Sequence, residues 1–244
     1  MLSNPKETKN EIVQWIRNYF ERNGNGCHAV IGISGGKDSS VVAALCVEAL
    51  GADRVLGVLM PNGEQSDIQD SYRVVEDLGI NYKLVNISSA VTALTEELEC
   101  VMHVSEQTRV NLPPRIRMAT LYAIAQSLPG GGRVANTCNR SEDFVGYSTK
   151  FGDSVGDFSP LQNIMVHEVR QIGHELHITK SLVDKVPADG LCGKTDEDNL
   201  GFTYAQVDDF IMHGTCGIIS IDYKIQEMNR KNTHKLKPMP AYSA

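Results

Sequence analysis

The sequence lacks both an excess of positive charge and any long hydrophobic run. Of its 244 residues, 23 are Lys or Arg and 30 are Asp or Glu, so the net charge is −7. A surface that binds nucleic acid needs basic residues to neutralise phosphates, so this charge argues against such a partner. No apolar stretch reaches the roughly 18 residues of a membrane-spanning helix, and residues 1–7 contain no apolar core of signal-peptide length. We therefore expect a cytoplasmic protein with no nucleic-acid or membrane partner.

Paired cysteines are missing as well. The six cysteines are scattered along the chain and form no Cys-x-x-Cys pair, which excludes the common zinc-site and thioredoxin-like patterns. In a reducing compartment we expect free thiols. Cys138 lies inside a candidate site described below, but no nearby histidine is evident to activate it, so we do not expect a nucleophilic cysteine.

What the sequence does contain is an alternation of short apolar segments with helical patterns. This alternation predicts βαβ units and therefore an α/β fold, with a parallel twisted sheet in a three-layer α/β/α arrangement. From about residue 146 the chain becomes polar and glycine-rich before helical patterns return. We expect one domain spanning residues 1–244, with the portion from about 146 completing the site. Strands are predicted at 29–33, 55–60, 82–87 and 133–137, and helices at 10–21, 40–50, 67–78, 90–103, 114–127, 166–177, 203–213 and 217–230.

A polar, glycine-rich segment follows the first apolar run directly. It reads Ser34-Gly35-Gly36-Lys37-Asp38-Ser39-Ser40, and a helical pattern comes next. Glycines let the backbone approach an anion closely, and the start of a helix presents unpaired N–H groups. Asp38 suits a phosphate site only if a divalent cation lies between them. The spacing fits neither a Walker A loop nor the dinucleotide fingerprint. A turn without a ligand is the alternative, but it would need far fewer polar groups, so we predict a phosphate-binding loop.

Three later segments carry further polar groups, and each has an ordinary structural explanation when taken alone. Residues 136–142 follow a predicted strand and could simply cap a helix through Asn139 or Ser141. Residues 146–157 include Lys150 between an aromatic residue and glycines, and could be a solvated surface loop. Residues 186–197 include Thr195, which on its own is best explained as a helix cap followed by acids at the positive end of the helix.

Taken together, these segments resemble ammonia-dependent NAD synthetases, which belong to the ATP pyrophosphatases. The loop alone indicates the ATP pyrophosphatase group, and the other segments select the member. The resemblance runs from residue 34 to residue 235. Its most specific pieces are Ser34–Ser39, Arg115-Ile116-Arg117-Met118, Thr137 through Glu142, Gly146 through Asp153, and Val186–Leu191 with Thr195-Asp196-Glu197.

The resemblance implies an adenine nucleotide alpha hydrolase-like fold, a homodimer and a ligase reaction. In this family ATP adenylates the nicotinate carboxylate of deamido-NAD, and ammonia then displaces AMP to give NAD, the final step of NAD biosynthesis. Forms that use glutamine carry a separate amidase domain, for which 244 residues leave no room. Free ammonia is therefore the expected nitrogen donor, and Asp153 is the candidate carboxylate for deprotonating ammonium.

The same resemblance implies roles for particular residues. Mg²⁺ would be held by Asp38 and Glu142, and these two residues with Lys150 are the expected catalytic groups. The expected ATP contacts are Gly32, Ile33, Ser34, Gly35, Gly36, Lys37, Asp38, Ser39, Thr137 and Thr195. The expected deamido-NAD contacts are Arg115, Lys150, Asp157, His234 and Lys235.

Two departures from the family pattern stand out. The family usually has an ATP-contacting lysine where this chain has Val166, and His167, Arg170 or Lys194 could replace it. Pro114 stands where alanine is usual, which a first helical turn would tolerate. Two other functions remain open: another ATP pyrophosphatase-type adenylating ligase, such as a GMP synthetase or a tRNA-thiolating enzyme, or a nucleotide-binding module that has lost catalysis.

Overall fold

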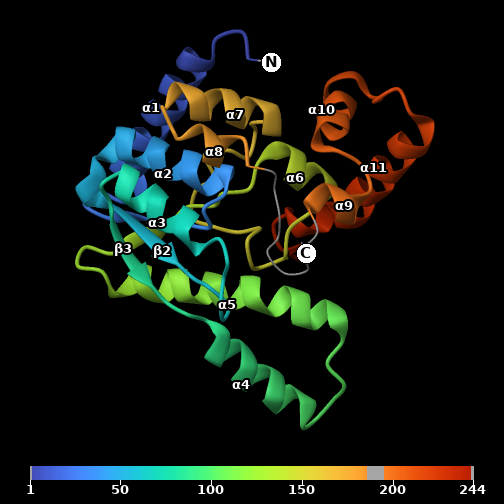
Figure 1. Ribbon diagram of the computed structural model, residues 1–244, viewed down its shortest axis with the longest axis horizontal. Helices are drawn as coiled ribbons and strands as arrows, with labels where there is room; N and C mark the ends of the chain where they lie inside the picture. Colours follow the sequence, from blue (N-terminus) through green and yellow to red (C-terminus); the bar gives the residue numbers. More distant parts are fainter. Residues whose placement is uncertain (1, 186–194, 243–244) are drawn as a thin grey trace.

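The computed structural model describes residues 2–185 and 195–242, and its centre is a four-stranded parallel sheet (Figure 1). The strands lie in the order β3-β2-β1-β4, so that Val30 of β1 pairs with Leu56 of β2 on one side and Val134 of β4 on the other. The predicted α/β fold with a parallel sheet is therefore confirmed. The strands are β1 (His28–Gly32), β2 (Val55–Leu59), β3 (Asn81–Leu84) and β4 (Gly132–Val134).

One face of the sheet is covered by helices that pack into a large apolar core. Side chains alternate along a strand, and Ala29 and Ile31 of β1 point into this core, whereas Val30 belongs to the core on the opposite face. The covering helices are α1 (Pro5–Asn23), α2 (Lys37–Leu50), α3 (Ile68–Asp77) and α7 (Val166–Glu175). A short 3₁₀ turn, η1 (Ala52–Arg54), joins α2 to β2.

The opposite face is covered by α5 (Glu106–Ser127), whose Met118 and Leu121 pack against β1 and β4. α4 (Ser88–Glu99) and the first part of α5 form an arm that projects beyond the sheet (Figure 1). No residue of α4 is buried. The helix predicted at 114–127 begins earlier, because the Ser105 side chain caps it by accepting from the Thr108 N–H at 3.2 Å.

The expectation that Pro114 lies in a first helical turn is therefore wrong. Pro113 and Pro114 both lie inside α5, where a proline donates no N–H to the helical hydrogen-bond ladder. Pro114 packs closely against the loop at Gly152, where an added Cβ would come within 3.0 Å of the Pro114 Cβ. The proline pair thus marks the place where a later loop lies on the helix.

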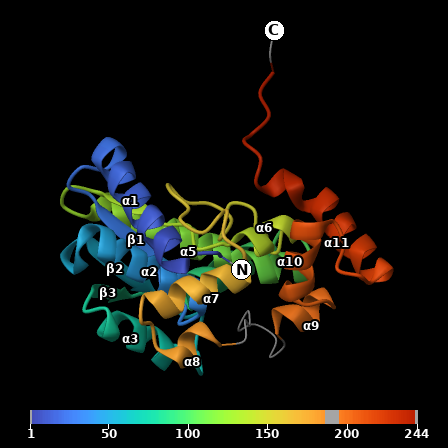
Figure 2. The ribbon, with the colours of Figure 1, turned by 90° about the horizontal axis from the view of Figure 1, so that it is seen from above.

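The C-terminal part of the chain forms a smaller apolar cluster of its own, beside the sheet (Figure 2). The cluster includes Val145, Val166, Leu200, Tyr204 and Ile225. The helices predicted at 166–177, 203–213 and 217–230 are present. The shorter helices of this region were not predicted, because they have too few turns to show a periodicity in the sequence. The remaining elements are α6 (Arg140–Val145), α8 (Lys180–Val183), α9 (Asp196–Leu200), α10 (Tyr204–His213), α11 (Ile219–Asn232) and η2 (Thr233–Lys235).

Among the described residues, no helix combines the length and the apolarity needed to span a membrane.

Candidate active site

The glycine-rich loop between β1 and α2 has the conformation that its sequence requires. Gly35 adopts a φ of 77°, a left-handed value that side chains other than glycine rarely take. A Cβ at this position would also lie 2.7 Å from the Cβ of Asp70 and 2.8 Å from the Ser71 nitrogen, both on α3. Glycine is therefore needed both for the turn and for the close contact with α3.

Serine side chains hold this loop in shape by bonding to the loop itself. The Ser34 and Ser39 hydroxyls lie 3.1 Å apart, and Ser34 Oγ accepts from the Gly36 N–H at 3.2 Å. The Ser40 hydroxyl donates to the Gly36 carbonyl at 2.7 Å. No side chain caps the start of α2, so its first-turn N–H groups remain available to an anion.

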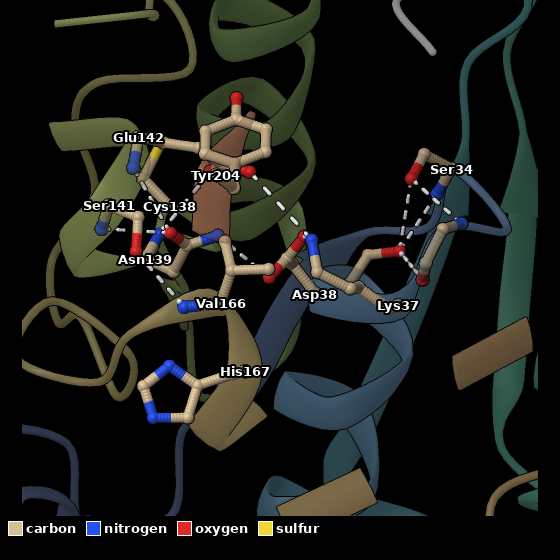
Figure 3. Close-up of polar contacts among 12 residues, drawn as sticks. Ser34, Lys37, Asp38, Cys138, Asn139, Ser141, Glu142, Val166, His167 and Tyr204 are labelled. Carbon is tan, nitrogen blue, oxygen red and sulfur yellow. Dashed lines mark hydrogen bonds and ion pairs between the residues drawn. The ribbon is translucent and has the colours of Figure 1, made fainter. Parts of the chain in front are cut away.

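Charged groups from two different elements meet at the start of α2 (Figure 3). Lys37 is only 3% exposed, and its Nζ lies 2.6 Å from Asp38 Oδ2 and 4.0 Å from Glu142 Oε1 of α6. The Asn139 side chain donates to Asp38 Oδ1 at 3.0 Å, which ties the start of α6 to the start of α2. The structure therefore brings Glu142 to the neighbouring residues Lys37 and Asp38, which lie about a hundred residues earlier in the sequence.

The pKa values in this group reflect burial and mutual charge. Burial disfavours the protonated form of Lys37, but the negative charges of Asp38 and Glu142 outweigh it and raise its pKa, and the positive charge of Arg170 opposes them. Burial raises the pKa of Glu142 to about 8; the nearby negative charge of Asp38 adds to this shift and Lys37 reduces it. The positive charge of Lys37 thus does not fully offset the cost of ionising Glu142, and a bound cation would lower that cost.

The start of α6 follows the capping geometry that its sequence allowed. Asn139 Oδ1 accepts from the N–H groups of Ser141 and Glu142, both at 3.1 Å. The structural explanation of this segment is therefore confirmed, but the same Asn139 side chain also reaches Asp38. Thr137 lies in the turn between β4 and α6, at the carboxyl end of the sheet, where ligands of parallel sheets bind.

A buried aspartate that sequence analysis missed connects three helices behind this group. Asp208 of α10 is 3% exposed and accepts from the Ser141 hydroxyl of α6. Its other oxygen lies 2.6 Å from Nδ1 of His167 on α7. The Ser141 hydroxyl also accepts from the Val166 N–H at 3.0 Å. No motif marks Asp208 in the sequence, because its partners come from distant segments.

Tyr204 is a second buried polar residue that the sequence did not reveal. It is 2% exposed, and its hydroxyl has no hydrogen-bond partner in the described part of the chain. Burial raises the pKa of Tyr204, and the negative charges of Glu142, Asp196 and Asp38 raise it further. The ring lies beside Glu142 in Figure 3, so Tyr204 and Asp196 belong to the surroundings of the same carboxylates.

The polar loop predicted at residues 146–157, called the lysine loop from here on, packs against α5 at Pro113 and Pro114. Arg115 Nε donates to the Lys150 carbonyl at 3.2 Å, and the Thr149 hydroxyl donates to Asn111 Oδ1 at 2.7 Å. The Lys150 ammonium lies 5.2 Å from the centre of the Phe151 ring, within the range of a cation–π contact. Arg115 and Lys150, which were predicted separately, are therefore neighbours.

Lys235 joins this loop from the other end of the chain. Its Nζ donates to the carbonyls of Gly146 at 2.7 Å and Ser148 at 2.9 Å. The neighbouring His234 of η2 is exposed, and its ring contacts the Lys231 carbonyl near the end of α11 rather than the loop. Of the two tail residues, the structure thus brings only Lys235 into contact with the lysine loop.

Asp157 and Thr195 are engaged elsewhere. Asp157 Oδ2 accepts from the Val134 N–H at 2.8 Å, and its Oδ1 accepts from the Tyr122 hydroxyl at 3.3 Å. Thr195 caps α9 by accepting from the Asp198 N–H at 3.1 Å, so the helix-cap explanation is confirmed. Residues 186–191 and Lys194, which also entered the sequence predictions, lie outside the described residues.

Comparisons with known proteins point to one family. A sequence model of the NAD synthase family matches residues 8–239. An NH3-dependent NAD+ synthetase of Pyrococcus horikoshii is 39% identical over 92% of this chain and 89% of the relative. The corresponding protein of Archaeoglobus fulgidus is 36% identical over 94% of this chain and 93% of the relative.

Solved structures give the same fold. The NMN synthetase of Francisella tularensis superposes with a TM-score of 0.90 at 32% identity, covering 99% of both chains. The NH3-dependent NAD synthetase of Campylobacter jejuni superposes with a TM-score of 0.79 at 24% identity, covering 100% of both chains. With a family match over nearly its whole length and relatives well above 30% identity, the chain belongs to the NAD synthase family.

Proposed function

We propose that this chain catalyses the ATP-dependent amidation of deamido-NAD with ammonia, which yields NAD, AMP and pyrophosphate through an adenylated carboxylate. The observation that carries this proposal is the uncapped start of α2 beside the carboxylates of Asp38 and Glu142. An anion site next to two carboxylates suits a nucleotide–metal complex better than a free anion. The reaction is inferred from family membership, and the described residues include groups suited to binding its substrates.

ATP binds along the loop and at the carboxyl ends of the strands. Residues 32–39 surround the phosphates through backbone N–H groups, with the loop already held in shape by Ser34 and Ser39. Thr137 contacts the nucleotide from the turn after β4. Thr195 contacts it from the cap of α9, although its hydroxyl is already engaged with Asp198. Preorganised donors of this kind stabilise charge that develops on the departing pyrophosphate.

The residues present fit a magnesium ion held by Asp38 and Glu142. Burial, followed by the charge of Asp38, raises the pKa of Glu142, and a cation placed between the two carboxylates would offset both causes. The described residues contain no cluster of three or more metal-ligating side chains, and Mg²⁺ commonly takes one or two carboxylates together with substrate oxygens. When bound, the ion screens the negative charge of the phosphates from the attacking carboxylate. Lys37 then keeps Asp38 oriented toward the site.

Deamido-NAD binds at the cluster formed by Arg115, Lys150 and Lys235. Their positive charges attract the dinucleotide phosphates, and the guanidinium of Arg115 offers a planar fork for one of them. Lys150 positions the substrate for reaction. Asp157 and His234 remain proposed contacts at the margins of this cluster. Ammonia attacks as neutral NH₃, and Asp153, whose Oδ1 already accepts from the Thr149 N–H at 2.8 Å, is the proposed proton acceptor.

The chain acts as one domain and assembles as a homodimer in the cytoplasm. The part after residue 146 is linked to the sheet through Asp208, which bridges α6, α7 and α10. The arm of α4 and α5 exposes Leu94, Val101, Met102 and Val110, an apolar surface typical of a contact with a second copy. The described cysteines are free thiols, as expected in a reducing compartment.

Incubating the purified chain with ATP, Mg²⁺, ammonium and deamido-NAD tests the proposal. AMP and NAD should form in equal amounts, and glutamine at the same concentration as ammonium should support little turnover. Formation of neither product would refute the enzyme assignment. Equally fast turnover with glutamine would refute ammonia as the donor.

A second candidate is the same chemistry on a mononucleotide, so that the product is NMN. The observation that favours it is the Francisella tularensis NMN synthetase, which superposes with a TM-score of 0.90 against 0.79 for the Campylobacter jejuni NAD synthetase. The reacting carboxylate is the same in nicotinate mononucleotide and in deamido-NAD, so the loop and the metal ligands serve both. Competition between the two substrates in one assay decides: the substrate with the higher kcat/KM is the one consumed first.

A further inference from the structure

The resemblance to ammonia-dependent NAD synthetases implies an ATP-contacting lysine at position 166, but this position is apolar here. Val166 is 3% exposed and packs with Leu200, Phe202 and Tyr204 in the C-terminal cluster. Its side chain cannot supply positive charge to a phosphate. If ATP binds at the loop, another group must compensate for the missing cation.

His167, the next residue, is held by a different partner. Its Nδ1 lies 2.6 Å from Asp208 Oδ2, and Asp208 is buried behind α6 and α7. This contact with a buried carboxylate fixes the orientation of the imidazole ring. Figure 3 shows Val166 and His167 on α7, next to the start of α2.

Arg170 lies one turn further along α7, on the same side of the helix as Val166. Residues three or four positions apart share a helix face, so positions 166, 170 and 173 form one line. At one end of this line, the Val166 N–H contacts Ser141 of α6. At the other end, Gly173 packs against Val41 of α2, one turn after Lys37. Arg170 therefore lies on the helix between these two contacts, and it is close enough to Lys37 for its positive charge to oppose the raised pKa of that lysine.

The Arg170 side chain has no partner in the described part of the chain. It forms no hydrogen bond or ion pair there, and its Nε atom is buried without an acceptor. A buried, unpaired donor on a charged group is unfavourable, so an anion that accepts from Arg170 would be stabilised there. Lys37 is different, because Asp38 and Glu142 already neutralise it.

We propose that Arg170 binds the two outer phosphates of ATP, and the pyrophosphate formed from them, and so replaces the lysine that this chain lacks at position 166. The planar guanidinium donates to two phosphate oxygens at once, whereas Lys37 stays with Asp38 and Glu142. The inference rests on the proposed function, since it assigns a residue to the nucleotide site of that reaction.

Calorimetry on the full chain with Mg²⁺ tests this role with the two products as separate probes. Arg170→Met should weaken pyrophosphate binding by roughly 10- to 100-fold, because a hydrogen bond to a charged group is worth about 1.5–3 kcal/mol. AMP affinity should stay within about twofold, since AMP does not contain these phosphates. Arg170→Lys should recover part of the loss. Arg73→Met, which removes an exposed arginine on α3, is the matched control and should change neither affinity.

Each other outcome has a definite meaning. Equal pyrophosphate affinity in Arg170→Met and the unmutated chain overturns the inference. A parallel loss of AMP and pyrophosphate binding, together with a lower Tm in both Arg170 variants, also overturns it, because that pattern reports damage to the fold. If the unmutated chain makes no AMP in the turnover assay, the proposed function itself fails, and the inference fails with it. In the kinetic assay, Arg170→Met should raise KM for ATP and leave KM for ammonium unchanged.

Discussion

The two ends of the candidate site hold their charges in different ways. At the loop end, formed by residues 32–40 and 139–142, side chains bond to one another: Lys37 and Asn139 both contact Asp38. At the basic end, formed by Arg115, Lys150 and Lys235, contacts are made to backbone carbonyls, as when Lys235 bonds to Gly146 and Ser148. A contact between two side chains depends on the identity of both residues. A backbone carbonyl, in contrast, can accept a hydrogen bond from any donor that reaches it. The loop end is therefore the more sensitive to substitution.

This comparison separates two kinds of effect. A preassembled group that stabilises the transition state changes kcat when it is damaged. A mobile cation that attracts the substrate mainly changes KM. Substitutions at the loop end should therefore reduce turnover or stability, and those at the basic end should reduce apparent affinity.

The largest effect should come from Asp38→Asn. The change keeps the size of the side chain but removes a proposed metal ligand and the charged partner of Lys37, so kcat should fall on the order of a hundredfold or more. Steady-state kinetics with deamido-NAD measure this, and Tm shows that the fold is retained. Asp53→Asn, at an exposed position in η1, is the control. A kcat near that of the unmutated chain would show that Asp38 has no role in turnover. The two ends of the site would then not differ in their sensitivity to substitution.

Asp208→Asn should have the next largest effect, and it should appear as a loss of stability. Asp208 is buried and accepts from Ser141 and His167, so the substitution leaves a strained or unpaired buried group at a cost of about 2–3 kcal/mol. Chemical denaturation measures the loss. The neighbouring Asp209 is exposed, and Asp209→Asn should change stability by less than about 0.5 kcal/mol. Equal values for the two variants would show that the Asp208 network does not hold the three helices together.

Glu142→Gln should show how much stability the protein loses by placing the Glu142 carboxylate close to Asp38 at the loop end. Burial, followed by the charge of Asp38, raises the pKa of Glu142 from 4.5 to about 8. Between these pH values the folded state binds more protons than the unfolded state, so the stability of the metal-free chain falls as pH rises from about 5 to 8. The neutral amide removes this dependence, and at pH 8 the variant should melt about 4 °C higher than the unmutated metal-free chain. At pH 5 the two should melt together.

Magnesium provides the control for that measurement. Adding Mg²⁺ at pH 8 should raise the Tm of the unmutated chain more than that of Glu142→Gln, because the substitution removes one of the two carboxylates proposed to hold the ion. Equal responses to Mg²⁺ would contradict the role of Glu142 as a ligand.

The smallest effect is expected at the basic end, from Lys235→Met. The change removes one cation that also bridges the loop carbonyls, and we expect KM for the dinucleotide to rise by about fivefold with kcat nearly unchanged, equivalent to about 1 kcal/mol. Lys237→Met removes an exposed lysine two residues away and serves as the control. If kcat fell sharply in Lys235→Met, the basic end would have to be counted among the groups that act on the transition state.

The loop end could be predicted from sequence because its parts are local. The strand, the turn and the helix start follow from apolar runs, glycines and hydroxyls within residues 28–40, and Asn139 shows its capping role within three residues. The long-range partners could not be predicted. Asp208 and Tyr204 lie in an ordinary amphipathic helix, and only the fold shows that they face α6 and α7. The start of α5 was predicted too late in the sequence. Because Pro114 would suit a first helical turn, the capping role of Ser105 further upstream was overlooked.

Those prolines have a consequence for how the molecule opens. Pro113 and Pro114 donate no N–H, so the carbonyls of Arg109 and Val110 receive no bond from the helical ladder within α5. The helix is thereby divided into a solvent-exposed outer segment and an inner segment clamped on the sheet. Amide hydrogens of the outer segment should exchange with solvent well before those around Leu121. The arm should thus fray and re-form while the strands beneath the loop at residues 34–40 stay closed.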